Sequence, residues 1–88
     1  TYKRQRVTTR IARKADIVII IGGRNSANTR RLYELSKDIL KDVYLIETAD
    51  EIKKEWFKNK KVIGISAGAS TPDWIIKGVI NKIKELKF

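Results

Sequence analysis

Cysteine, histidine and methionine are all absent from this 88-residue sequence. Without thiolate or imidazole ligands, the chain cannot itself hold a soft metal ion or an iron–sulfur cluster, and it cannot run an acid–base cycle that uses histidine. The lack of cysteine also excludes a disulfide, which agrees with a cytoplasmic location. Redox chemistry would therefore need groups from outside these residues.

Long hydrophobic runs are missing as well. The longest, Ile17 to Ile21, is far too short to cross a bilayer, and the basic amphipathic pattern that opens the chain differs from the apolar core of a signal peptide. We therefore expect no membrane association. The chain begins with Thr1 and not with Met, inside a predicted helix, so we expect a piece of a longer protein.

Acidic residues are scarce relative to basic ones, with Asp+Glu at 10 against Lys+Arg at 20 and a net charge of +10. Such a charge suits anionic partners, namely phosphates, nucleic acid or an acidic domain, but a solvated lysine-rich surface also accounts for it. RNA binding would need exposed aromatic residues among basic ones, whereas Trp56 and Trp74 fall near apolar stripes. We therefore predict no nucleic-acid partner.

The hydrophobic pattern predicts helices alternating with short strands. Ile17 to Ile21 is a continuous β-branched run, typical of a strand that is covered on both faces, and strands are also expected at 43–46 and 62–65. Helical spacing predicts helices over about 3–14 and about 28–41. A capping box at Thr48 and Glu51 predicts a third helix, and Pro72 as first helical residue predicts a last one. The expected inward residues are Val7, Ile11, Ala15, Leu32, Leu35, Ser36, Ile39, Leu40, Ala49, Ile52, Trp56, Ile76, Val79, Ile80, Ile83 and Leu86.

This alternation predicts a single α/β domain over residues 1–88. We expect a small three-layer structure with a parallel sheet of at least three strands, in the order 2-1-3, and helices on both faces. Ligands of such sheets bind beyond the carboxyl ends of the strands, at the switch point between the first and third strands. The loops that should meet there are 22–29 and 66–73.

Both loops place small residues, hydroxyls and amides at the start of a helix. A helix N-terminus offers free N–H groups and partial positive charge to an anion. The plainer interpretation is that Ser26 or Asn28, and Ser70 or Thr71, only cap their helices. Because two such loops converge, we predict that they bind a phosphate together, although the pattern is neither a Walker loop nor a dinucleotide fingerprint. The nearby arginines, which would add long-range attraction but are expected to be mostly solvated, are Arg24, Arg30 and Arg31.

At these residues the sequence resembles the 4-hydroxy-3-methylbut-2-enyl diphosphate reductase family. Residues 1–5 are similar to the Thr-x-x-Arg-Gln that follows the family's third cluster cysteine, and residues 21–29 to its Gly-x-(Lys/Arg)-Asn-Ser-x-Asn segment. Residues 66–73 are similar to its Thr-Ala-Gly-Ala-Ser-x-Pro stretch. The fit extends to Glu47 and Trp56, so the resemblance covers essentially the whole chain.

The resemblance implies the C-terminal third of a three-domain oxidoreductase of isoprene biosynthesis. Such an enzyme uses a 4Fe-4S cluster and an external electron donor to remove a hydroxyl group from an allylic diphosphate, which gives isopentenyl and dimethylallyl diphosphates. The cluster cysteines, the diphosphate-binding histidines and the proton-supplying Glu would lie upstream, in the partner domains. This chain alone would therefore be inactive.

The same matching assigns substrate-binding roles to residues of this chain. Ser26 and Asn28 from the first loop, and Ser70 from the second, would bind diphosphate oxygens. Ala27 stands where other members have a second serine, so it would contribute only its N–H, and Thr1 would lie near the cluster and the substrate. The alternative is a free-standing phosphate- or nucleotide-binding α/β module.

Overall fold

Three parallel strands form the centre of the computed structural model, which describes residues 2–86. Strand β1 (Ile17–Ile21) lies between β2 (Val43–Ile46) and β3 (Ile63–Ala67), so the predicted order 2-1-3 is confirmed. Ile21 is level with Ile46 on one side and with Ala67 on the other, so all three strands end at the same edge. The remaining elements are α1 (Tyr2–Lys14), α2 (Ala27–Lys37), the 3₁₀-helices η1 (Ala49–Glu51) and η2 (Lys54–Phe57), and α3 (Asp73–Leu86).

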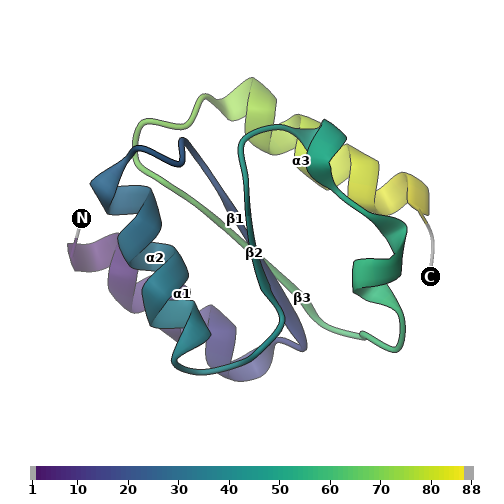
Figure 1. The fold of residues 1–88 in the computed structure, drawn as a ribbon, viewed down its shortest axis with the longest axis horizontal. Helices are drawn as coiled ribbons and strands as arrows, with labels where there is room; N and C mark the ends of the chain where they lie inside the picture. Colours follow the sequence, from purple (N-terminus) through teal and green to yellow (C-terminus); the bar gives the residue numbers. More distant parts are fainter. Residues whose placement is uncertain (1, 87–88) are drawn as a thin grey trace.

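Helices cover both faces of the sheet, as the sequence predicts (Figure 1). Every residue of β1 is buried, because successive side chains of a strand point to opposite faces and both faces are covered here. Val18 and Ile20 pack with Ala12 of α1 and Leu32 of α2. The other side chains of β1 pack on the opposite face with α3, η1 and η2 in one cluster: Ile17, Ile19, Ile21, Ile46, Ile52, Phe57, Ala67, Val79 and Ile83.

The predicted third helix is wrong. Two short 3₁₀-helices replace it, and between them Ile52 has an extended backbone, with φ −72° and ψ 133°. Ile52 and Phe57 are both buried, yet residues five apart on a regular α-helix point about 140° away from each other. The extended step allows both side chains to reach the core, and Trp56 stacks on Tyr44 with ring centroids 4.0 Å apart.

Several boundaries and faces also differ from the predictions. Helix α2 ends at Lys37 instead of residue 41, because the chain needs the next residues to turn back into β2, and this leaves Ile39 exposed. The buried face of α1 is centred on Thr8 and Ala12, so Val7 is 45% exposed. Trp74 lies away from the apolar stripe of α3 and is 74% exposed.

Strand β3 begins and ends later than the predicted 62–65, so two residues assigned to the second loop belong to the strand. Ser66 is one of them, and its hydroxyl lies 2.6 Å from that of Thr8 in a buried pair. Helix α3 likewise begins one residue late, at Asp73, after Pro72. No helix among residues 2–86 is long and apolar enough to cross a membrane.

Asp16 connects the end of α1 to the start of the sheet. Its carboxylate oxygen Oδ2 accepts hydrogen bonds from the N–H groups of Lys61 (2.8 Å) and Val62 (2.9 Å), and its own N–H donates to the carbonyl of Val62 (2.8 Å). The bonds from Val62 and Lys61 stabilise the charged form, so they hold the pKa of Asp16 below its ordinary 3.8. The residue therefore aligns the starts of β1 and β3.

We predict that Asp16→Asn lowers the midpoint of urea unfolding at neutral pH. Because the folded-state pKa lies below the unfolded value of 3.8, this stabilisation is present above pH 3.8 and is lost as the pH falls through the folded pKa. Unfolding curves of the variant and the wild type should therefore converge in acid. Asp50→Asn, at another exposed aspartate, is the control. An equal fall in the urea midpoint of that variant would argue against a special stabilising role for the Asp16 carboxylate.

Candidate anion-binding site

The loops that follow β1 and β3 meet at one backbone carbonyl. The oxygen of Ile21, the last residue of β1, accepts hydrogen bonds from the N–H of Gly68 (2.9 Å) and from the hydroxyl of Thr71 (3.1 Å). Thr71 also closes a turn by donating its N–H to the carbonyl of Gly68 (3.0 Å). The convergence of the two loops, predicted from the strand order, is therefore confirmed (Figure 1).

Thr29, in the first turn of α2, lies between the two loops and is fully buried. A Cβ atom on Gly22 would lie 2.4 Å from its Oγ1, and one on Gly68 would lie 2.2 Å from the same atom. Among the described residues this hydroxyl has no hydrogen-bond partner. Its role is therefore steric, because only glycine at both positions lets the loops approach the start of α2 this closely.

The first loop ends in a capped helix N-terminus. Ser26 is the N-cap of α2, and its hydroxyl accepts a hydrogen bond from the N–H of Thr29 at 3.3 Å. This is the capping role that the plainer interpretation allows. Ala27 and Asn28 are the next two residues and are exposed. Their N–H groups precede the first helical hydrogen bonds, so they remain able to bind an anion.

The second loop brings Ser70 to the same edge of the sheet. Ser70 is exposed and shares a hollow of about 280 Å³ with Gly22 and Gly23 of the first loop. Ser26 and Asn28 are not among the lining residues of this hollow. That Ser26, Asn28 and Ser70 bind one ligand together stays a prediction, and Thr1 lies outside the described residues.

Arg24 is a residue of the first loop whose setting the sequence does not show. The sequence predicts that Arg24 is mostly solvated. Its guanidinium instead forms ion pairs with Glu47, at 3.1 Å, and with Glu51. Partial burial alone would raise the pKa of Glu51, but hydrogen bonds from Arg24 and from the N–H groups of Glu47 and Thr48 outweigh it and lower this pKa below 4.5. The hydrogen bond to Glu51 in turn raises the pKa of Arg24. Both groups are therefore charged at neutral pH.

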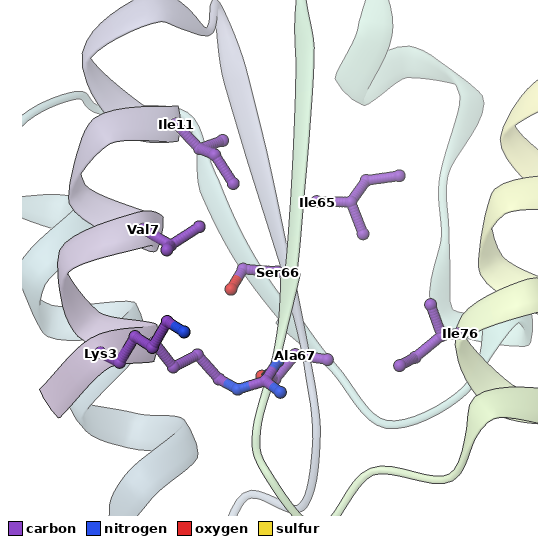
Figure 2. Close-up of a pocket in the computed structure, with 8 residues that line it drawn as sticks. Lys3, Val7, Ile11, Ile65, Ser66, Ala67 and Ile76 are labelled. Atoms are coloured by element: carbon purple, nitrogen blue, oxygen red, sulfur yellow. The ribbon is translucent and has the colours of Figure 1, made fainter. Parts of the chain in front are cut away.

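A second hollow, of about 540 Å³, lies beside β3 between α1 and α3 (Figure 2). Its lining residues are Lys3, Arg4, Val7, Ile11, Ile65, Ser66, Ala67 and Ile76. Arg4 is tied to the end of β3, since its Nη1 donates to the carbonyl of Ala67 at 2.8 Å. The walls of this hollow are mainly apolar, and its basic lining residues, Lys3 and Arg4, belong to the first turn of α1. The hollow lies beside the outer strand β3, whereas ligands of open parallel sheets bind where the loops after neighbouring strands meet. We therefore place the anion site at the two loops.

No group of three or more potential metal-ligating side chains comes together within the described part of the chain. The sequence also contains no cysteine. These residues therefore do not fit an iron–sulfur cluster, whose irons are held mainly by cysteine thiolates.

Comparison with known proteins gives one family. The sequence model of the family described as "LytB protein" matches residues 1–84. A 4-hydroxy-3-methylbut-2-enyl diphosphate reductase from Campylobacter jejuni subsp. jejuni (serotype O:23/36, strain 81-176) is 54% identical over 87 residues, which are 99% of this chain. The enzyme of the same name from Nautilia profundicola is 52% identical over 86 residues. The chain spans 31% of the length of each of these relatives.

Solved structures agree with the sequence comparison. One of (E)-4-hydroxy-3-methyl-but-2-enyl diphosphate reductase, described as the terminal enzyme of the non-mevalonate pathway, superposes with a TM-score of 0.91 at 55% identity. It matches 93% of this chain and 29% of its own. A structure of the E-1-hydroxy-2-methyl-but-2-enyl-4-diphosphate reductase from Plasmodium falciparum has a TM-score of 0.87 at 27% identity, over 92% of this chain and 26% of its own.

We predict that Gly68→Ala destabilises the fold by about 1–3 kcal/mol, because the new methyl group would overlap Thr29. Thr29→Ala in the same chain should restore most of this loss, since the nearest remaining side-chain atom, the Cβ of residue 29, lies 3.4 Å away. Gly23→Ala is the matched control, because nothing lies within 4 Å of a Cβ there. Thermal unfolding of the variants measures the effect, and equal losses in the presence and absence of Thr29 would contradict this packing.

Proposed function

The chain belongs to the LytB protein family, and on this basis we propose that it is the diphosphate-binding, C-terminal part of a 4-hydroxy-3-methylbut-2-enyl diphosphate reductase. The observation that supports this most directly is the meeting of the two loops at the carbonyl of Ile21, where the family-like residues lie at one edge of a parallel sheet. That edge is where open α/β sheets bind their ligands. The curated relatives named above carry the same activity in their names.

In this proposal the two loops bind the diphosphate group of the substrate. The side chains of Ser26, Asn28 and Ser70 donate hydrogen bonds to its oxygens. Ala27 contributes its backbone N–H at the start of α2, where the helix dipole also favours negative charge. The hydroxyl of Ser26 can donate its proton to the ligand while its oxygen continues to accept from Thr29.

The reaction itself depends on groups from outside this chain. The complete enzyme would remove the hydroxyl group of an allylic diphosphate by reduction, with electrons from an external donor and a 4Fe-4S cluster held by cysteines of other domains. These 88 residues contain no cysteine to hold such a cluster, so their contribution is to bind and orient the substrate. A substrate fixed at its diphosphate presents its other end to the reacting groups in one orientation. The whole enzyme would be cytoplasmic.

Neutral donors suit this task. A diphosphate bound by hydroxyl, amide and backbone N–H groups gains many directional hydrogen bonds, and hydrogen bonds to a charged oxygen are stronger than those to a neutral one. The arginine within the first loop is engaged with two carboxylates, which leaves the direct contacts to the uncharged groups.

We predict that in the full-length enzyme Asn28→Ala and Ser70→Ala each raise the KM for the allylic diphosphate about tenfold or more. A lost hydrogen bond to a charged oxygen costs roughly 1.5–3 kcal/mol, whereas an exposed lysine contributes about 0–1 kcal/mol. Lys77→Ala, on the exposed side of α3, is the control. Steady-state kinetics compares the variants, and an equally damaging Lys77→Ala would show that the site lies elsewhere.

We also predict that the 88-residue chain alone binds no iron and turns over no substrate. After anaerobic reconstitution with iron and sulfide, its visible spectrum should lack the charge-transfer absorption of an iron–sulfur cluster. The full-length protein treated in the same way is the positive control. A stoichiometric cluster that survives purification of the 88-residue chain would refute the division of labour described here.

A further inference from the structure

Arg24 joins the first loop to the segment after β2 through its backbone as well as its side chain. Its N–H donates to Oε2 of Glu47 at 3.0 Å, while its guanidinium pairs with Oε1 of the same carboxylate at 3.1 Å. The nitrogen in that ion pair is Nη1, whereas Nη2 donates a hydrogen bond to Oε1 of Glu51 and lies 3.4 Å from the carbonyl oxygen of Leu45. The guanidinium is therefore held at three acceptors.

The carboxylate of Glu51 is itself fixed by the backbone. Its Oε2 accepts hydrogen bonds from the N–H groups of Glu47 (2.7 Å) and Thr48 (3.2 Å), so both of its oxygens are engaged. On the other side, Arg24 lies within the turn that Ser26 closes by donating its N–H to the carbonyl of Gly23 (3.0 Å). A continuous set of bonds thus runs from the end of β2, through Glu51 and Arg24, to the N-cap of α2.

We propose that Arg24 is a positioning residue for the diphosphate site, which acts through Glu47 and Glu51 to fix the first loop and does not contact the ligand. This inference rests on the proposed function. Direct binding would require the guanidinium to leave both carboxylates, and two unpaired negative charges would then lie beside a diphosphate. Pairing with Arg24 neutralises one of these charges and keeps the turn before Ser26 in place.

The two carboxylates allow a test in which positioning and simple electrostatics predict opposite signs. Removing a negative charge near an anion site tightens anion binding if the charge acts only at a distance. If Glu51 positions the loop, its loss weakens binding in spite of the more favourable charge. Glutamine is the suitable replacement, because it has the same shape but only one oxygen acceptor, which cannot serve Arg24 and the two N–H groups together.

The first measurement is inhibition of the full-length enzyme by inorganic pyrophosphate, together with the KM and kcat for the allylic diphosphate. For Glu51→Gln we expect about fivefold weaker pyrophosphate binding, a similar rise in KM and little change in kcat. Glu47→Gln should change in the same direction. Glu34→Gln removes the same charge from the exposed surface of α2 and should bind as the wild type does. Unchanged or tighter binding in both Glu51→Gln and Glu47→Gln would overturn the proposal.

The second measurement places Arg24→Ala in the wild type and in the Glu47→Gln/Glu51→Gln background. A residue that acts through the two carboxylates weakens binding about fivefold in the wild type and adds little in the double variant. An equal loss in both backgrounds would show direct contact with the ligand and overturn the proposal. If the wild-type enzyme itself neither binds pyrophosphate nor reduces the substrate, the proposed function fails, and the inference fails with it.

Discussion

The candidate site depends on the carbonyl oxygen of Ile21. It stands at the end of the central strand and accepts hydrogen bonds from both the backbone and a side chain of the loop that follows β3. Parallel pairing brings the ends of β1 and β3 level, but these two bonds hold the second loop against the first. Thr29 then fixes the distance between them, since it occupies the space that side chains at Gly22 and Gly68 would need. The site is therefore a property of the sheet edge and not of either loop alone.

The net positive charge of the chain is not concentrated at the candidate anion-binding site. The excess of basic residues amounts to +10, yet the loops that we assign to the diphosphate offer hydroxyl, amide and backbone donors. Arg24, the basic residue within the first loop, is engaged by Glu47 and Glu51. The net positive charge can draw an anion toward the molecule, because electrostatic attraction acts over distances of about 10 Å at moderate salt. The orientation of the bound anion at the sheet edge then depends on short-range hydrogen bonds.

Much of the fold could be predicted because it follows from local patterns and from general rules of connection. The β-branched run at 17–21 and the short hydrophobic run at 43–46 locate two strands, and the alternation of elements leads to the order of all three. The segment after Thr48 could not be predicted in the same way, because its capping box signals a helix start while the burial of Ile52 and Phe57 requires a break. The network of Arg24 was also missed, since its partners lie 23 and 27 residues away and meet it only in the folded chain.

The open edge of β3 has a consequence for handling the chain in solution. Within the described residues this strand pairs on one side only, and apolar side chains such as Val7, Ile65 and Ile76 lie beside it. An unpaired edge next to apolar surface is a place where copies of a chain can add to one another. Mutual repulsion between copies that each carry a net charge of +10 opposes this. Salt screens that repulsion. Low ionic strength therefore keeps copies of the isolated 88-residue chain apart, whereas high ionic strength favours their self-association.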